Sequence, residues 1–129
     1  FKFFIYIKLK YILFLILMSA RIKDILIINN KSQLVQYKEL IPNGNNLEIK
    51  INYLEQESPK GLPDAFIIGE QFIGKDNVAL ILGDNFFYGQ NLSKMLTSWT
   101  ELNQGAKIIL HKMPTPELFG VAKVNSLKK

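Results

Sequence analysis

Cysteine is missing from this 129-residue sequence, and histidine occurs once. Without a thiol the chain can form no disulfide bond, no thiolate metal site and no cysteine nucleophile. The single histidine, His111, has no second ligand type nearby at metal-binding spacing, so we assign it no role. A chain without cysteine is compatible with a reducing compartment, and we expect a cytoplasmic protein.

Proline and glycine are also scarce, with five and eight residues respectively. The sequence contains no low-complexity segment and no internal repeat, and 48% of its residues are hydrophobic against 21% charged. This balance is typical of a globular chain and argues against disorder. We therefore expect residues 1–129 to form part of a single domain.

A basic stripe of the kind that binds nucleic acid is absent. The net charge is +5, but the lysines are scattered and do not alternate with aromatic residues. We expect no nucleic-acid partner, because the phosphates of small substrates are sufficient to match this excess of positive charge.

The N-terminal apolar region is too short for a complete membrane span. Phe1–Met18 is apolar except for Lys2, Lys8 and Lys10, and its unbroken part, Tyr11–Met18, falls short of the about 20 apolar residues that a span needs. The residues after Met18 match a signal-peptide cleavage site poorly. We favour a buried helix here, with targeting or membrane attachment as the alternative. The first residue is not Met, so we expect a fragment.

A strand followed by a helix is predicted next. Asp24–Ile28 is a continuous apolar run with a polar exit, which is typical of a strand buried on both faces. The following helix should begin at Ser32 as its N-cap and end at Pro42–Gly44. The residues expected near one face of this helix are Leu34, Tyr37, Lys38 and Ile41.

Apolar and polar residues then alternate from Leu47 to Tyr53, which predicts a strand near the sheet edge with one wet face. The loop Gln56–Pro63 precedes an apolar helix, Asp64–Phe72. The Gly61 backbone can come close to a ligand, and the Gln56 amide can read an edge with one donor and one acceptor. An ordinary surface turn is the alternative for this loop.

Val78–Leu82 has no polar face and predicts a central strand of a parallel sheet. Since the strand ends at Gly83, Asp84 would lie just beyond its carboxyl end, where open α/β sheets bind ligands. A carboxylate in that place suits Mg²⁺ held between protein and phosphates. Asp84 as a turn former or helix N-cap is an equally open alternative.

A further helix and strand complete the pattern. The helix follows Asn91 as a candidate N-cap, and its apolar stripe, which we interpret as core packing, contains Leu92, Met95, Leu96, Trp99 and Leu102. Ala106–Leu110 predicts another buried strand. Because strands and helices alternate, we predict an α/β fold of partial Rossmann-like type, with a mostly parallel sheet and helices on both faces.

Several motifs resemble those of bacterial glucose-1-phosphate thymidylyltransferases, members of the sugar nucleotidyltransferase family. These motifs are Asp24–Ile28, Gln56–Leu62, Ala65–Glu70, Leu82–Asn85 with Phe87–Gly89, and Phe119–Val121. The resemblance extends from about Tyr11 to Val124, while residues 1–10 match poorly. It implies that Tyr11–Arg21 is the family's helix before the second strand, which weakens the membrane interpretation further.

The resemblance also implies roles for individual residues. Asp84 is similar to the family's first magnesium-binding aspartate, and Leu82 would line the same pocket. Gln56 and Gly61 resemble the pair that reads thymine, with the Gln side chain and the Gly backbone facing the base. Leu62 would pack beside the sugar and the nucleoside.

Two departures from the family pattern accompany these matches. Gly120 is similar to a backbone contact with the hexose, but Phe119 stands where the family usually has tyrosine, so one hydroxyl is lost. The glycine-rich GxGTR signature expected before Tyr11 is absent, as are the following lysine, the downstream Glu-Lys-Pro motif and the second metal aspartate. The resemblance thus implies an internal piece of a longer enzyme, with little turnover by itself.

The activity implied by the resemblance is nucleotidyl transfer from dTTP to glucose 1-phosphate, giving dTDP-glucose and pyrophosphate. Mg²⁺ is the implied cofactor, the dTDP-rhamnose route to polysaccharides the implied pathway, and a homo-oligomer the implied state of the full-length protein. Three alternatives stay open. They are a non-catalytic nucleotide-binding remnant, a sibling enzyme that uses UTP or ATP, and a membrane-anchored peptide whose only support is Phe1–Met18.

Overall fold

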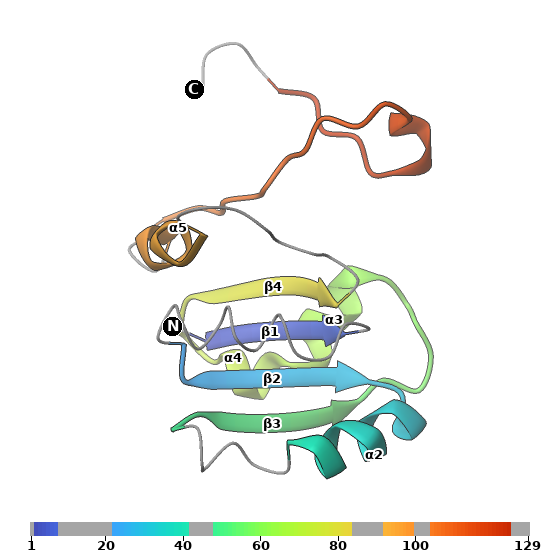
Figure 1. The fold of residues 1–129 in the computed structure, drawn as a ribbon, viewed down its shortest axis with the longest axis vertical. Helices are drawn as coiled ribbons and strands as arrows, with labels where there is room; N and C mark the ends of the chain where they lie inside the picture. Colours follow the sequence, from blue (N-terminus) through green and yellow to red (C-terminus); the bar gives the residue numbers. More distant parts are fainter. Residues whose placement is uncertain (1, 8–21, 42–47, 84–91, 100–103, 125–129) are drawn as a thin grey trace.

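Four parallel strands form the centre of the computed structural model, which describes residues 2–7, 22–41, 48–83, 92–99 and 104–124 (Figure 1). For residues 2–7, 92 and 93 only the backbone is described. The strands are β1 (Lys2–Ile7), β2 (Asp24–Asn29), β3 (Lys50–Glu55) and β4 (Val78–Gly83). Their order across the sheet is β3-β2-β1-β4, and each neighbouring pair is parallel.

The N-terminus supplies an inner strand of the sheet, so our expectation of a helix from Phe1 is wrong for Lys2–Ile7. β1 lies between β2 and β4, with Lys2 opposite both Asp24 and Val78. Aromatic and β-branched residues favour a strand, yet a continuous apolar run has no period that separates a buried strand from a buried helix. Residues 8–21, including the helix expected there, lie outside the described part of the chain. In the described part, no helix is both long and apolar enough to cross a membrane.

β2 is buried on both faces, which confirms the strand predicted for Asp24–Ile28. Its four residues Ile25–Ile28 are each 0% exposed, so neither face of this strand meets water. Successive side chains of a strand point to opposite faces. Ile25 and Ile27 accordingly belong to one hydrophobic cluster and Leu26 and Ile28 to a second one.

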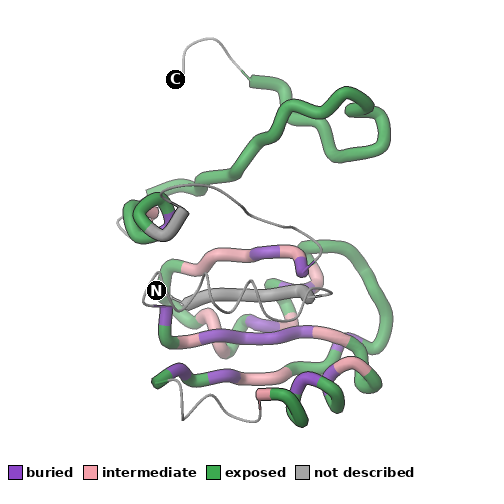
Figure 2. The backbone as a smooth tube through the Cα atoms, viewed as in Figure 1, coloured by how far each residue is buried: buried purple, intermediate pink, exposed green. Residues whose placement is uncertain are grey.

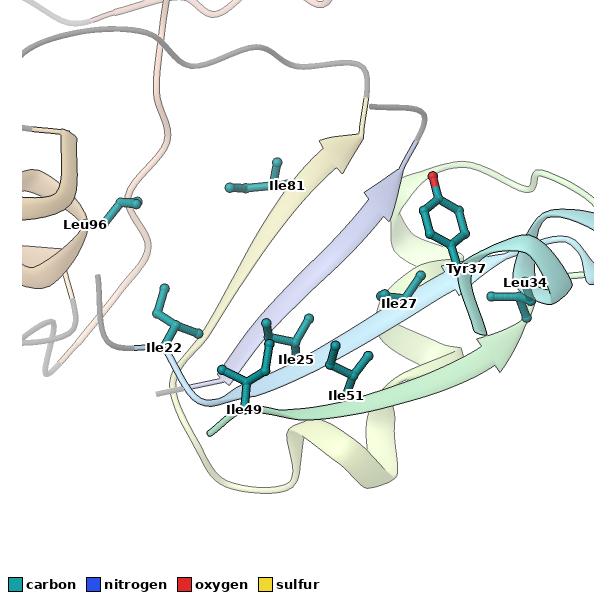
Figure 3. Close-up of a cluster of buried hydrophobic side chains, with 9 residues drawn as sticks. All are labelled: Ile22, Ile25, Ile27, Leu34, Tyr37, Ile49, Ile51, Ile81 and Leu96. Carbon is teal, nitrogen blue, oxygen red and sulfur yellow. The ribbon is translucent and has the colours of Figure 1, made fainter. Parts of the chain in front are cut away.

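The first cluster is covered by α2 (Lys31–Leu40). Leu34 and Tyr37 of this helix are buried with Ile25 and Ile27, as Figure 3 shows. The helix begins earlier than predicted, because Asn30 and not Ser32 is its N-cap. The Asn30 side chain accepts the backbone N–H of Gln33 at 3.0 Å and the hydroxyl of Ser32 at 2.8 Å.

The second cluster lies under α3 (Leu62–Ile68) and α4 (Glu70–Ile73), where we predicted one helix over Asp64–Phe72. Ala65 of α3 is buried against Leu26 and Ile28. Gly69, with φ −84° and ψ 1°, is both the C-cap of α3 and the N-cap of α4, so the helix is divided in two at this residue. Helices therefore cover both faces of a parallel sheet, and the predicted α/β fold is confirmed.

The helix α5 (Leu92–Trp99) contributes two residues of its predicted apolar stripe to the first cluster. Leu96 is buried there and Trp99 packs against the cluster, whereas Met95 is 37% exposed. Asn91 and Leu102 lie outside the described residues. The core-packing interpretation is thus confirmed for Leu96 and Trp99 and wrong for Met95, which does not belong to the cluster.

Of the two outer strands of the described sheet, β3 has the edge position that the sequence predicted and β4 does not have the central position predicted for it. β3 is an edge strand with Ile51 buried and Lys50 exposed, as its alternating pattern predicted. β4 was predicted as a central strand, but it is the opposite edge of the described sheet and Val78–Leu80 is only partly buried. The reason is that Ala106–Leu110, the next strand predicted along the chain, is not a strand, and no described strand pairs with the outer side of β4.

Residues 104–124 extend away from the sheet in Figure 1 and are exposed throughout (Figure 2). The buried strand predicted for Ala106–Leu110 is therefore wrong, and Ile108 is 74% exposed. An apolar run of this kind becomes a strand only when a neighbouring strand completes its hydrogen bonds. The segment's regular element is a short 3-10 turn, η2 (Pro116–Leu118).

Tyr53 of β3 gives the fold a predictable response to alkaline pH. Its hydroxyl donates to the carbonyl of Ile41, the Lys38 ammonium lies 5.7 Å from its ring centroid, and burial raises its pKa to about 12. Because the folded pKa lies above the unfolded value of 10.0, stability is fully present below about pH 10 and lost as pH rises through 12. Tyr53→Phe should lower the melting temperature at pH 8 and flatten its alkaline decline.

The decline is measured by circular dichroism melts between pH 8 and about pH 12, the range over which the tyrosine titrates. Burial also raises the pKa of Tyr37, so some alkaline loss should persist in Tyr53→Phe and shrink in a Tyr37→Phe, Tyr53→Phe double variant. An alkaline decline identical in the wild type and Tyr53→Phe would contradict the role given to Tyr53.

Candidate functional site

The carboxyl ends of the four strands meet along one edge of the sheet. Ile7 lies opposite Gly83 and Asn29 lies opposite Glu55, so the strands end nearly level. β2 and β3 extend the sheet to one side of β1, while β4 lies on the other. The switch point is therefore between β1 and β4, and open α/β sheets bind ligands in the crevice outside such a point.

Asp84 directly follows Gly83, the last residue of β4. Its own position lies outside the described residues, so the choice between metal ligand and turn former or cap is still a prediction. Leu82 is partly buried and stands opposite Tyr6 near the switch point. β4 thus ends, at Gly83, at the edge of the sheet where open α/β sheets bind ligands.

Gln56 begins the loop after β3 and is held from two sides. Its backbone N–H donates to the carbonyl of Asn29 at 3.0 Å, which ties it to the end of β2. Its side-chain Nε2 donates to Asp64 Oδ2 at 2.6 Å. The residue is only 5% exposed, and a polar side chain is buried at low cost when it is hydrogen-bonded in this way.

Asp64 is a residue that our sequence reasoning did not select. It lies in the first turn of α3, where acidic residues are common because the helix dipole favours them. Because the helix dipole is by itself a sufficient reason for an acidic residue here, the sequence pattern did not predict a contact between Asp64 and Gln56. The feature of the sequence that could have indicated this contact is the position of Asp64 at the start of the helix that follows the Gln56 loop.

Gly61 gives the loop its shape. Its backbone has φ 91° and ψ 174°, a region that is essentially restricted to glycine. α3 starts immediately afterwards at Leu62, which is 46% exposed. The structure therefore places Gln56 and Gly61 on the loop between β3 and α3 and Leu62 at the start of α3, with Gln56 buried and Gly61 and Leu62 exposed.

The predicted residues do not all lie close together. β3 and β4 are separated by two intervening strands, so Gln56 and Leu82 lie roughly 14 Å apart across the sheet at the usual strand spacing. A ligand that touches both must be extended. Phe119 and Gly120 lie on the exposed segment 104–124, away from the strand ends, and their hexose contact stays a prediction.

The described residues form no cluster of three or more His, Cys, Asp or Glu side chains. A magnesium site stays a prediction that depends on Asp84.

Comparison with known proteins adds to this geometry. A family model described as nucleotidyl transferase matches residues 3–129. The chain belongs to this family. The match includes all four strands of the sheet.

Two relatives among the nucleotidyl transferases carry the same name. The chain is 44% identical over 110 residues to a glucose-1-phosphate thymidylyltransferase of Neisseria meningitidis, and this match covers 85% of the chain and 38% of the relative. It is 36% identical over 110 residues to the glucose-1-phosphate thymidylyltransferase of Mycolicibacterium smegmatis, again covering 38% of that protein. The chain thus spans well under half the length of these relatives.

A solved structure supports the fold of this nucleotidyl transferase chain. It is a Bacillus anthracis protein assigned as a glucose-1-phosphate thymidylyltransferase, in complex with a sucrose. The TM-score is 0.83 at 24% identity, over 98% of this chain and 61% of that one. At this identity the similarity shows a shared fold.

The backbone of Gly61 yields a test of the loop. Gly61→Ala should destabilise the protein by about 1 to 3 kcal/mol, because alanine avoids this backbone conformation. Crowding contributes little, since an added Cβ would meet Pro63 Cδ at an ordinary 3.7 Å. Urea unfolding measures the loss, and Gly120→Ala, with nothing within 4 Å of its added Cβ, is the control. Equal stability of Gly61→Ala and wild type would show that the loop does not require glycine.

Proposed function

We propose that this chain is part of an enzyme that transfers a thymidylyl group from dTTP to glucose 1-phosphate. The observation that carries the proposal is the Gln56 amide, held by hydrogen bonds at the carboxyl edge of a parallel sheet and followed by the glycine-specific bend at Gly61. Membership of the nucleotidyl transferase family and the shared name of the relatives support it. The cytoplasmic location and the homo-oligomer implied by the resemblance are part of the same proposal.

In the proposed reaction, a phosphate oxygen of glucose 1-phosphate attacks the α-phosphorus of dTTP. The bond to the β-phosphate breaks, pyrophosphate leaves, and dTDP-glucose is formed. Gln56 and the Gly61 backbone would orient the thymine, and Leu62 would pack against the nucleoside. Leu82 would line the pocket at the switch point. Such transfer depends mostly on positioning and charge neutralisation.

Asp84 is the residue of this chain that would hold Mg²⁺. The chemistry that Mg²⁺ supplies when bound is neutralisation of the charge that develops on the phosphates. A carboxylate directly after a strand at the switch point is a suitable hard ligand for this ion. Near the end of the sequence, Gly120 would contact the hexose through its backbone. Phe119 would contact it through its ring, without the hydroxyl that a tyrosine would supply.

Entry of a base to Gln56 requires a local rearrangement, because the side chain is 5% exposed. Residues 57–61 of the adjoining loop are all exposed. This loop can therefore shift without breaking the hydrophobic clusters of the sheet. We infer that it moves aside when a nucleotide binds.

A second candidate function is nucleotide binding with little turnover. The residues after β1 are Lys8, Leu9 and Lys10, and they carry no glycine-rich signature that could cradle a triphosphate. This observation favours weak binding of the base and nucleoside by the chain alone. A sibling activity with UTP or ATP in place of dTTP is distinguished by comparing the three nucleotides.

Base reading by Gln56 is tested by calorimetric titration with dTTP and dCTP. The wild type should bind dTTP more tightly than dCTP, and Gln56→Met should reduce the ratio of the two affinities by roughly tenfold, the typical worth of a paired hydrogen-bonding edge. Gln71→Met, at an exposed position of α4, is the matched control. Equal affinity of the folded wild type for both nucleotides would remove the base-reading role.

The role of Asp84 is tested in a hybrid whose remaining length comes from the Neisseria meningitidis relative. Asp84→Asn keeps the size of the side chain but removes the negative charge. Pyrophosphate release should fall about a hundredfold or more, because a lost metal ligand forfeits several kcal/mol of charge stabilisation. The melting temperature should hardly change. A variant that keeps its rate and loses stability would identify Asp84 as a turn former or cap.

A further inference from the structure

The hydrogen bond between Gln56 and Asp64 joins the loop after β3 to the first turn of α3. Gln56 is the first residue after β3, and Asp64 belongs to the first turn of α3. The distance from Nε2 to Oδ2 is 2.6 Å, which is at the short end for an N–H···O bond, and bonds to charged acceptors are shorter than neutral ones. An ionised carboxylate can only accept hydrogen bonds. It therefore attracts the NH₂ side of the Gln56 amide and repels the carbonyl side.

This one-sided preference decides what the rest of the amide can do. The NH₂ group of glutamine has two hydrogens, of which Asp64 takes one. The second N–H and the carbonyl Oε1 are left as one donor and one acceptor. Because Nε2 is held on the side of Asp64, the order of this donor and acceptor in space is also set.

The order matters because the two pyrimidine types present opposite edges. Thymine and uracil offer an N3–H donor next to an O4 acceptor, whereas cytosine offers an N3 acceptor next to an amino donor. A glutamine amide matches the first edge in one orientation and the second edge after a 180° flip. A freely turning Gln56 would therefore pair with both.

We propose that Asp64 is a positioning residue that locks the Gln56 amide in one orientation and so selects thymine over cytosine. The proposal rests on the proposed function, in which Gln56 reads the base. Its distinct content is that base selection depends on a carboxylate that lies behind the reading residue. Fixing the amide in advance also spares part of the ordering cost that binding places on a flexible side chain.

A purely structural role for Asp64 predicts something different. Acidic residues in a first helical turn stabilise the helix through its dipole, and Asp64 occupies such a position in α3. Glu70 has the same placement in the first turn of α4 and is exposed. A dipole effect would change stability at both positions and leave the choice of nucleotide unchanged at both.

The test compares Asp64→Asn with Glu70→Gln, each of which replaces a carboxylate by an amide of equal size. The amide introduced by Asp64→Asn would both donate and accept, so Gln56 could bond to it in either orientation. We expect the ratio of dTTP to dCTP affinity, measured by calorimetry, to fall by at least about fivefold in this variant. The ratio should be unchanged in Glu70→Gln. An Asp64→Asn variant that keeps the wild-type ratio would overturn the proposal.

A second measurement needs no nucleotide. In the ¹⁵N-labelled wild type, the two Gln56 NH₂ protons should differ in exchange with solvent, because one of them is bonded to Asp64. The protection of this proton should weaken in Asp64→Asn, where the Gln56 carbonyl can accept from the new amide instead, and it should be kept in Glu70→Gln. Two fast-exchanging protons in the wild type would overturn the proposal whatever the nucleotide data show.

The two measurements together separate this proposal from the proposed function. A slow Gln56 proton in a wild type that binds dTTP and dCTP equally would show an oriented amide that reads no base. That result removes the base-reading role and, with it, the selective role of Asp64. A wild type that prefers dTTP, together with an Asp64→Asn variant that keeps the preference, overturns only the role of Asp64.

Discussion

Complete burial of β2 is the constraint on which the other elements of the structure depend. Ile25–Ile28 have no exposed surface, and fully burying each such side chain contributes roughly 1.5–3 kcal/mol. Burial on both faces requires a helix layer on each side, which α2 and the pair α3 and α4 supply. It also requires a strand at each edge of β2, and these are β1 and β3. Parallel neighbours need long crossover connections, so the order of helices and strands along the chain follows from the same constraint.

The candidate site is a consequence of this sheet. Parallel strands of matched register end at one edge, and the loops that leave that edge carry the residues able to bind a ligand. Gln56 follows β3 directly, its backbone is bonded to the last residue of β2, and its side chain is bonded to α3. The amide is thus fixed by the two layers that pack the core. A rigid scaffold that holds one polar group in place is well suited to reading the edge of a small ligand.

Several elements could be predicted from the local sequence pattern, because the pattern of each is compatible with one kind of secondary structure. The alternation around Lys50 and Ile51 identified an edge strand, and the polar exit of Asp24–Ile28 marked the end of a buried one. Two apolar runs were misread. The sequence predicts a helix over Lys2–Ile7 and a buried strand over Ala106–Leu110, and both predictions are wrong because an apolar run without a period does not reveal whether a neighbouring strand exists. β1 has neighbours on both sides, whereas residues 104–124 are exposed.

The sequence by itself determined the fold class and the position of a loop, containing Gln56 and Gly61, between a strand and a helix. Hydrophobic period and turn chemistry are local properties, and the family resemblance depends on motifs that are contiguous in the chain. Only the tertiary structure decided the place of β1 inside the sheet, the edge position of β4 and the bond from Asp64 to Gln56. These features depend on which segments meet in space. Gln56 and Asp64 are eight residues apart along the chain, and they become hydrogen-bond partners only when α3 packs against the sheet that contains β3.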